Sequence, residues 1–207
     1  MHSPGRTAAA WLCAATVIML AGCSGLQTTP SESTAQFIPN STLTHWQLRG
    51  KIGVKNSDSA NSGYLNWLQC GERFEVRING PLGSGAVKLV GDEHAVTFYE
   101  NNRPPVSAAS AEELLQQQLG WPIPVNQLSY WVRGIPAPNA FARHTELGFK
   151  QLGWNLDFPR QTQADAYRLP AKAIARQRDL TVTLILQQWQ LQPDCNDLQA
   201  DAAGSTP

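Results

Sequence analysis

Alternation of apolar and polar residues dominates the middle of the chain and predicts a β-sheet. Apolar side chains stand at every second position in residues 46–54, 74–78, 96–98 and 152–158. Successive side chains of a strand point to opposite faces, so this pattern is typical of half-buried antiparallel strands. Further strands are expected in residues 63–70, 86–90, 171–176 and 180–191. Turn-forming segments recur between them, which favours a meander that curls into a barrel or half-barrel.

Two helices are expected between these strands. Ser110 followed by Glu113 forms a capping box, and the apolar stripe that follows stops at Gly120. A second helix is expected after Pro124, with its end at Gly134. Helices grouped in a sheet-forming chain tend to cover an open face of the sheet. The predicted fold is therefore mainly β with α, a curled antiparallel sheet (an incomplete β-barrel) with a helical lid over an apolar cavity.

The N-terminus has the pattern of a lipoprotein signal peptide. Arg6 precedes a weakly polar to apolar run that ends in Leu20-Ala21-Gly22-Cys23, and the run is shorter than the ~20 apolar residues of a spanning helix. We expect cleavage after residue 22 and acyl chains on Cys23, which hold a protein to a bilayer at about 0.8 kcal/mol per buried methylene. The alternative is cleavage at another small residue, with Cys23 an incidental thiol. Ser24, where proteobacterial lipoproteins retained in the inner membrane usually have aspartate, resembles the pattern for the periplasmic face of the outer membrane.

Composition divides the rest of the chain into three parts. Residues 23–43 are rich in Ser, Thr, Gln and Pro and bury too little apolar surface to order themselves, so they predict a flexible tether. Residues 44–192 are long enough for one domain. The acidic segment 193–207 predicts a flexible tail.

Charge and cysteine content narrow the classes of partner. The signal peptide removes only Arg6 from sixteen basic residues, so the mature chain stays close to neutral. Its arginines are scattered and form no basic stripe, and we expect no binding of nucleic acid. With Cys13 removed and Cys23 acylated, Cys70 and Cys195 remain in a compartment that permits disulfides. These two cysteines either pair with each other or remain free or intermolecular thiols. If they pair, we expect the disulfide to stabilise the fold and to have no catalytic role.

The sequence contains no recognisable pattern of residues for catalysis or cofactor binding. His45, His94 and His144 lack metal-ligand spacing, so no metal is expected. The sequence has no Gly-x-Ser-x-Gly elbow, phosphate loop or dinucleotide fingerprint, which predicts a protein that is not an enzyme and needs no cofactor. The alternative is a lipoprotein hydrolase. It would require a catalytic serine or carboxylates that come together in the fold without a recognisable sequence motif.

Two groups of residues are candidates for binding. Trp67, Trp131, Trp154 and Trp189 fall on predicted strands or on the lid helix and form either ordinary core or the lining of an apolar cavity. The segment Gly80-Pro81-Leu82-Gly83 places one large apolar residue among residues that favour turns. Leu82 either folds back onto the core or points outward, where burial in a bilayer or partner would contribute about 1.5 to 3 kcal/mol.

These motifs together resemble the family of outer-membrane lipoprotein receptors LolB. The resemblance rests on Leu20 to Cys23, Trp46-Gln-Leu-Arg-Gly-Lys-Ile-Gly-Val54, Asn79-Gly-Pro-Leu-Gly-Ser84, Gly120-Trp-Pro-Ile-Pro-Val125, Leu128, Trp131-Val-Arg-Gly-Ile-Pro136, Leu169-Pro170 and Leu180 to Trp189. Cys70, the tail that holds Cys195, and residues 138–148 depart from it.

The resemblance implies a function as well as a fold. It implies an apolar cavity that receives acylated lipoproteins from the periplasmic carrier LolA, and a loop leucine, Leu82, that helps to deliver them into outer-membrane lipid. The four tryptophans match aromatic positions of the family. We expect a monomer that works without nucleotide, down a gradient of affinity for acyl chains. The rival interpretation is an outer-membrane lipoprotein with a packed interior that scaffolds envelope assembly.

Overall fold

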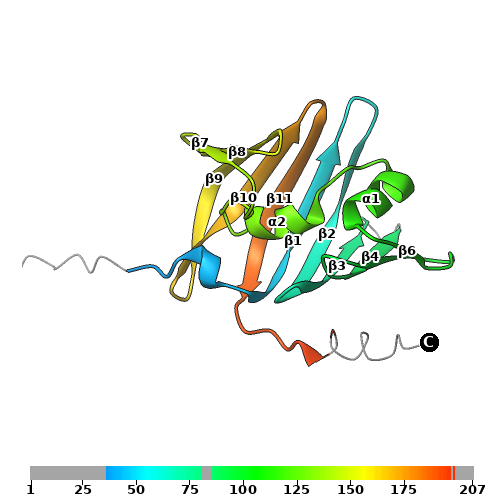
Figure 1. The fold of residues 1–207 in the computed structure, drawn as a ribbon, viewed down its shortest axis with the longest axis horizontal. Helices are drawn as coiled ribbons and strands as arrows, with labels where there is room; N and C mark the ends of the chain where they lie inside the picture. The colour runs from blue at the N-terminus through cyan, green and yellow to red at the C-terminus, as the bar shows by residue number, and fades with distance from the viewer. Residues whose placement is uncertain (1–35, 81–84, 197, 199–207) are drawn as a thin grey trace, which may run out of the picture. The chain divides into compact units, whose positions relative to one another are not determined.

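The architecture is one antiparallel sheet of eleven strands, arranged in the order β6-β5-β4-β3-β2-β1-β11-β10-β9-β8-β7 (Figure 1). It is seen in a computed structural model that describes residues 36–80, 85–196 and 198. Every neighbouring pair joins strands consecutive in sequence except β1 and β11, which pair antiparallel in the middle of the sheet. Because β6 and β7 lie at opposite ends of the order, the sheet is an open half-barrel.

The elements have the following bounds. A short 3-10 helix, η1 (Asn40–Thr42), precedes the strands, which are β1 (His45–Lys55), β2 (Ala60–Cys70), β3 (Arg73–Asn79), β4 (Ala86–Gly91), β5 (Val96–Glu100), β6 (Val106–Ala108), β7 (Ala142–His144), β8 (Gly148–Gln151), β9 (Trp154–Ala164), β10 (Tyr167–Gln177) and β11 (Leu180–Gln190). The helices α1 (Ala111–Leu119) and α2 (Val125–Trp131) lie between β6 and β7.

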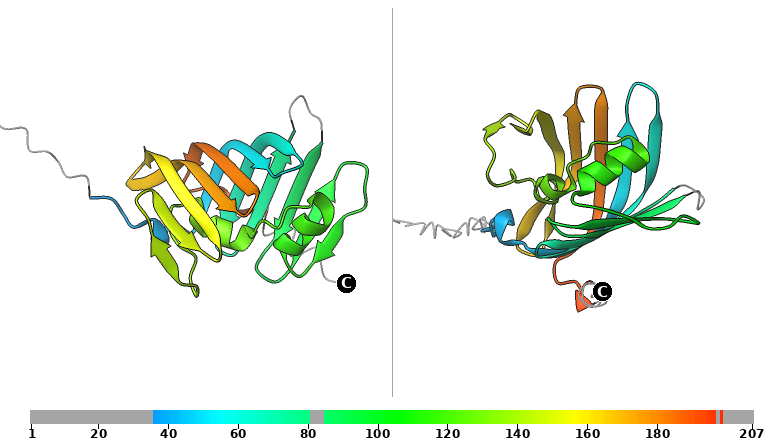
Figure 2. Two further views of the ribbon diagram at one scale, coloured as in Figure 1. Left: turned by 90° about the horizontal axis from the view of Figure 1, so that it is seen from above. Right: turned by 45° about the vertical axis from the view of Figure 1, so that its right-hand side comes forward.

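The sheet curves around both helices, which lie on its concave side (Figure 2). One irregularity is a register shift between Arg49 and Gly50, opposite β11. A side chain at Gly50 would overlap the carbonyl of Ile185, so the two strands approach closely there because residue 50 has no Cβ. Bulges and glycines of this kind increase the bend of a strand, which suits a half-barrel.

Local signals set three of the four helix ends as predicted. Ser110 Oγ accepts a hydrogen bond of 3.1 Å from the backbone N–H of Glu113, and Gly120 ends α1 with φ 72°. The second helix begins after Pro124 as expected, but its regular part ends at Trp131, and turns continue to Gly134 with φ 75°. Both glycines occupy the left-handed region, where a Cβ is unfavourable.

The inner face of the sheet and the helices share one apolar core. The alternating residues of β1 that predicted the first strand, among them Trp46, Leu48, Ile52 and Val54, are all buried. The helices contribute buried residues such as Leu114 and Leu128 to the same core. The predicted fold class is confirmed: a curled, open antiparallel sheet with helices on one face.

Some strand predictions need correction. Leu152 continues the alternation of Trp154 and was expected in that strand, but it lies in the β8–β9 turn with φ 51° and is 51% exposed. Strands β6, β7 and β8 were not predicted, because three or four residues at an edge carry too few side chains to show a period. Strand β10 begins at Tyr167, before the predicted start at Ala171, since Pro170 occupies an irregularity in its pairing with β9.

Contacts with the sheet extend beyond residues 44–192 at both ends. Asn40 Nδ2 donates to the carbonyls of Arg133 and Arg168 at 2.7 and 2.8 Å, and Leu43 is buried. After β11, Cys195 forms a disulfide with Cys70 across a Cα separation of 6.1 Å, and Leu198 is 4% exposed. The described residues all belong to one compact unit, and Cys23 lies outside them. Within the described part, no helix is long and apolar enough to cross a membrane.

Candidate functional site

An apolar cavity lies between the concave face of the sheet and the helices. All of its lining residues are apolar: Ile52, Leu65, Trp67, Val76, Ile78, Leu89 and Leu184 from the sheet, and Leu115, Trp121, Ile123, Val125 and Leu128 from the helical segment. Its free volume is about 30 Å³. A water molecule needs about 10–15 Å³ on this scale, so the lining side chains fill most of the interior.

The four predicted tryptophans gather in two places instead of one. Trp67 lines the apolar cavity and packs against Trp46 with ring centroids 5.3 Å apart. Trp189 meets the same Trp46 edge to face at 5.5 Å. The register explains this cluster, because Leu48 pairs with Trp67 on one side and with Trp189 on the other, so that all these side chains share the inner face. Trp46 was not among the predicted cavity residues, although its alternation with Leu48 is visible in the sequence.

The other two tryptophans lie in the opposite part of the core, beside a hydrogen-bond network in which every polar group is paired. We call this the closed network. Trp131 of α2 and Trp154 of β9 lie 5.9 Å apart. Trp131 Nε1 donates to Gln151 Oε1 at 2.8 Å, and the same oxygen accepts from the backbone N–H of Ala137 at 2.8 Å. Gln151 Nε2 donates to the carbonyls of Ala137 and Ala140 at 2.8 and 2.9 Å. The glutamine is 2% exposed, and its amide is fully paired.

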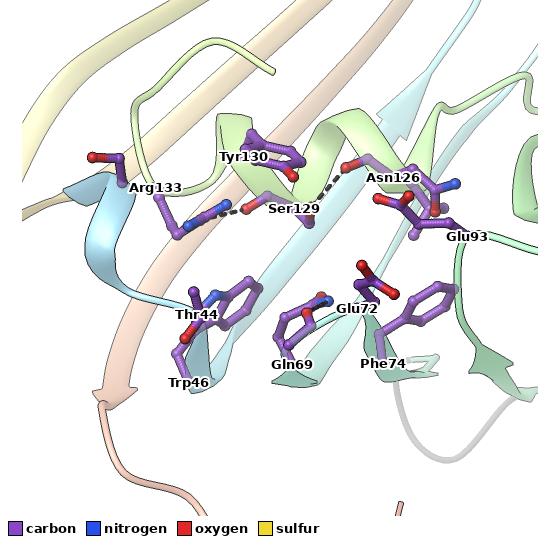
Figure 3. Close-up of a pocket in the computed structure, with 13 residues that line it drawn as sticks. Thr44, Trp46, Gln69, Glu72, Phe74, Glu93, Asn126, Ser129, Tyr130 and Arg133 are labelled. Carbon is purple, nitrogen blue, oxygen red and sulfur yellow. Dashed lines mark hydrogen bonds between the residues drawn. The ribbon is translucent and has the colours of Figure 1, made fainter. Parts of the chain in front are cut away.

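A second, polar cleft of about 350 Å³ opens beside the apolar cavity and shares Val125 with it. Figure 3 shows α2 and the turn after it on one side and the strand ends on the other. The helical side carries Asn126, Ser129, Tyr130 and Arg133, and the strand side carries Thr44, Trp46, Gln69, Glu72 and Phe74, with Glu93 at the β4–β5 turn. Ser41 of η1 and Gly71 of the β2–β3 turn also line the cleft. We call this the polar cleft.

Arg133 is a buried cation. Among the described residues, backbone carbonyls and an aromatic ring hold it in place. It is 6% exposed, and Nε donates to the Ser129 carbonyl at 3.0 Å while Nη1 donates to the Leu43 carbonyl at 2.6 Å. Its guanidinium carbon lies 4.8 Å from the Tyr130 ring centroid, a cation–π contact. Burial lowers the pKa of Arg133, and the nearby Tyr130 opposes that shift. None of the ion pairs found among the described residues involves Arg133.

Trp46 is a buried donor without an acceptor. Its side chain is completely buried, and among the buried side-chain atoms of the described segments its Nε1 alone has no hydrogen-bond partner. Trp67 and Trp189 of the same cluster do donate, to Gln69 Oε1 at 3.0 Å and to the Pro170 carbonyl at 3.4 Å. In Figure 3 the Trp46 nitrogen lies on the side of the ring turned toward α2. Buried polar groups are normally paired, so this one requires an explanation.

The predicted delivery loop is described only at its base. Gly80 N–H donates to the Gly85 carbonyl at 2.9 Å and closes the β3–β4 hairpin. Pro81, Leu82 and Gly83 lie outside the described residues. The described residues also contain no group of three or more side chains that could hold a metal ion.

Comparison with known proteins places the fold and then the family. The open antiparallel sheet with helices on its concave face is shared by a solved structure. A LolA superfamily protein from Nitrosomonas europaea matches with a TM-score of 0.50 and 8% identity, over 79% of this chain and 91% of that chain. The family model described as "Outer membrane lipoprotein LolB" matches residues 44–189, and the chain belongs to this family.

The curated relatives agree with this family. The outer-membrane lipoprotein LolB of Chromohalobacter salexigens is 36% identical over 200 residues, which cover 91% of this chain and 93% of the relative. The LolB of Pseudomonas fluorescens is 35% identical over 187 residues, covering 84% and 91%. The predicted family is therefore confirmed, and with it the place of the chain as a lipoprotein of the outer membrane.

Proposed function

We propose that this chain accepts acylated lipoproteins from the periplasmic carrier LolA and inserts them into the inner leaflet of the outer membrane. Membership of the LolB family supports a role as the outer-membrane receptor of lipoprotein localisation. The observation that carries the proposal is the interior between sheet and helices, where all lining side chains are apolar. Such a lining favours hydrocarbon over any polar ligand.

The energetics of acyl chains require direct transfer. Each buried methylene contributes about 0.8 kcal/mol, so release of three chains into water would cost tens of kcal/mol. Cargo therefore passes from the carrier's cavity to this one without entering water. Direction comes from affinity: this cavity holds acyl chains more tightly than the carrier does, and the bilayer holds them more tightly still. Nucleotide is not required in such a gradient.

Loading requires the interior to open. The free volume of about 30 Å³ is far too small for an acyl chain, because side chains of the helical segment fill the space over the sheet. Leu115 of α1 and Leu128 of α2 both line the cavity, as does Trp121 between them. Acyl chains must displace this segment from the concave face, and they then cover the apolar side chains of the sheet in its place.

Transfer between purified proteins tests the proposal. LolA loaded with a fluorescent lipoprotein is mixed with residues 24–207, which include every residue of the described compact unit, and the two are separated by an affinity tag. We expect the label to move to this chain without nucleotide, and to stay on the carrier when the chain is omitted. Label that stays on the carrier in both samples would refute the proposal.

The delivery loop has a separate test. Leu82→Glu is expected to leave uptake from LolA unchanged and to reduce transfer into liposomes of outer-membrane lipid, since the charged side chain cannot enter hydrocarbon. Leu147→Glu is the matched control, because Leu147 is an exposed leucine in a different turn. Equal loss of uptake and delivery, or a lower melting temperature, would place Leu82 in the core.

The second candidate function is a scaffold for envelope assembly, and the small free volume favours it. A displacement assay separates the two. An acyl-binding interior gives saturable displacement of a fluorescent fatty acid by unlabelled fatty acid, whereas a permanently packed interior gives none.

A further inference from the structure

The polar cleft adjoins the apolar cavity. In an acylated ligand, hydrocarbon chains are likewise joined to polar groups. Val125 lines both spaces, and Trp67 of the cavity packs against Trp46 of the cleft. The cleft is open to solvent and holds about 350 Å³, more than ten times the free volume of the cavity. A ligand whose chains enter the cavity past Val125 therefore has its polar end in the cleft.

The cleft presents hydrogen-bond donors that the protein does not use. Trp46 Nε1 is buried without an acceptor. Arg133 has five N–H groups, and its two hydrogen bonds in the structure employ Nε and Nη1 toward the Ser129 and Leu43 carbonyls. An unpaired buried donor such as Trp46 Nε1 is stabilised by any acceptor that reaches it, so a ligand that supplies acceptors is suited to this indole N–H and to the remaining N–H groups of Arg133.

The cleft also carries negatively charged hydrogen-bond acceptors. Glu72 and Glu93 line it opposite Arg133 and Tyr130 (Figure 3), and neither carboxylate takes part in the ion pairs found within the described segments. Two carboxylates disfavour a phosphate, since like charges repel at short range. They favour neutral groups that also bring N–H donors, such as amides. Donors and acceptors side by side match a ligand with ester carbonyls, amide carbonyls and amide N–H groups.

We propose that the polar cleft binds the polar head of the cargo, the ester and amide groups around its acylated cysteine, with Trp46 Nε1 and Arg133 as donors to the carbonyls and Glu72 and Glu93 as acceptors for the amide N–H groups. This assignment rests on the proposed function, because the acyl chains must enter the neighbouring cavity for the head to lie here. It adds a head-group subsite that distinguishes lipoprotein from other molecules with the same chains.

Three apolar probes with different polar ends test the assignment on residues 24–207. They are a tripalmitoylated cysteinyl-serine peptide, dipalmitoyl phosphatidylethanolamine, and a fluorescent alkane with no ester or amide. We expect Trp46→Phe to weaken binding of the lipopeptide about three- to tenfold, the effect of one lost hydrogen bond. Phosphatidylethanolamine, which has ester carbonyls but no amide, should be weakened by no more than this, and binding of the alkane should change less than twofold. Trp189→Phe is the matched control, since it removes the same volume from the same aromatic cluster and should leave the ratio between probes unchanged.

A spectroscopic readout separates hydrogen bonding from packing. The indole N–H resonance of Trp46, identified by its loss in Trp46→Phe, should shift on addition of the lipopeptide and stay in place with the alkane. The resonance of Trp131, whose N–H is already bonded to Gln151, serves as the internal reference. Lipopeptide binding without a shift at Trp46, or equal loss of all three probes in Trp46→Phe, overturns the head-group subsite. If the wild-type chain binds none of the probes, the proposed function itself fails.

Discussion

Two completely or almost completely buried tryptophans, Trp131 and Trp46, differ in how their indole N–H groups are satisfied. Trp131 donates to Gln151, whose amide also pairs with the backbone of Ala137 and Ala140. Trp46 donates to nothing in the described chain and faces a cleft that holds further unused donors. A satisfied network fixes one packing arrangement, whereas an unsatisfied donor beside a cleft marks a place where a ligand completes the network. The closed end of the core therefore stabilises the fold, and the proposed head-group subsite lies at the open end.

The disulfide at the open end should give the largest effect on stability. Cys70 lies between Gln69 and Gly71, which both line the polar cleft, and its bond to Cys195 closes a separation of 125 residues. Replacing both cysteines by serine is expected to lower the free energy of unfolding by about 4 kcal/mol, measured by urea denaturation. A free-thiol count near zero on the mature chain is the companion measurement. A loss below about 1 kcal/mol would show that this end does not depend on the bond.

Breaking the closed network should have the next largest effect. Gln151→Ala leaves the Trp131 N–H and three backbone groups buried without partners, and we expect a loss of about 3 kcal/mol in urea denaturation. Gln177→Ala is the control, because that side chain makes one hydrogen bond at the surface, of 3.2 Å, to the Leu152 carbonyl. If the two variants were equally stable, the network would not hold the closed end together.

The direct comparison of the two tryptophans comes third. Both Trp46→Phe and Trp131→Phe remove the same atoms from a buried site. Trp131→Phe also takes a donor from Gln151, while Trp46→Phe removes a donor that has no partner. We expect Trp131→Phe to be less stable than Trp46→Phe by about 1 kcal/mol in the absence of ligand. The opposite order would mean that Trp46 Nε1 is already satisfied in solution.

The turn that brings Glu93 to the cleft should show the smallest effect. A hydrogen bond from the backbone N–H of His94 lowers the pKa of Asp92 below its ordinary 3.8, against a smaller opposing effect of burial. A depressed pKa in the folded state means that the stabilisation is present above the unfolded pKa and is lost as pH falls through the folded value. Because this hydrogen bond lies at the surface, Asp92→Ala should cost about 0.5 kcal/mol at pH 7. The difference from wild type should shrink during acid titration below pH 3.8, and a difference independent of pH would contradict the assignment.

Strong local patterns were sufficient for most of the fold. Alternation in β1, the capping box at Ser110 and the glycine at residue 120 each predict a structure that neighbouring residues alone can decide. Leu152 shows the limit of that reasoning, because its parity fits strand β9 although the chain turns there with positive φ. Of the four tryptophans that the sequence offered as cavity candidates, Trp67 lines the apolar cavity, while Trp131, Trp154 and Trp189 pack elsewhere. Arg133 was missed, because a single arginine in a loop gives no sequence signal of burial.

The sequence by itself determined the membrane anchor motif, the family, the antiparallel strands and the presence of two helices, since each follows from residues close together in the chain. Only the tertiary structure decided that β1 pairs with β11, that Trp131 donates to Gln151, and that Trp46, Arg133 and two glutamates line one cleft. Hydrogen-bond partners and burial arise from contacts between residues about 20 to 145 positions apart in the chain. No local pattern specifies such contacts, because they depend on how the sheet curves around the helices.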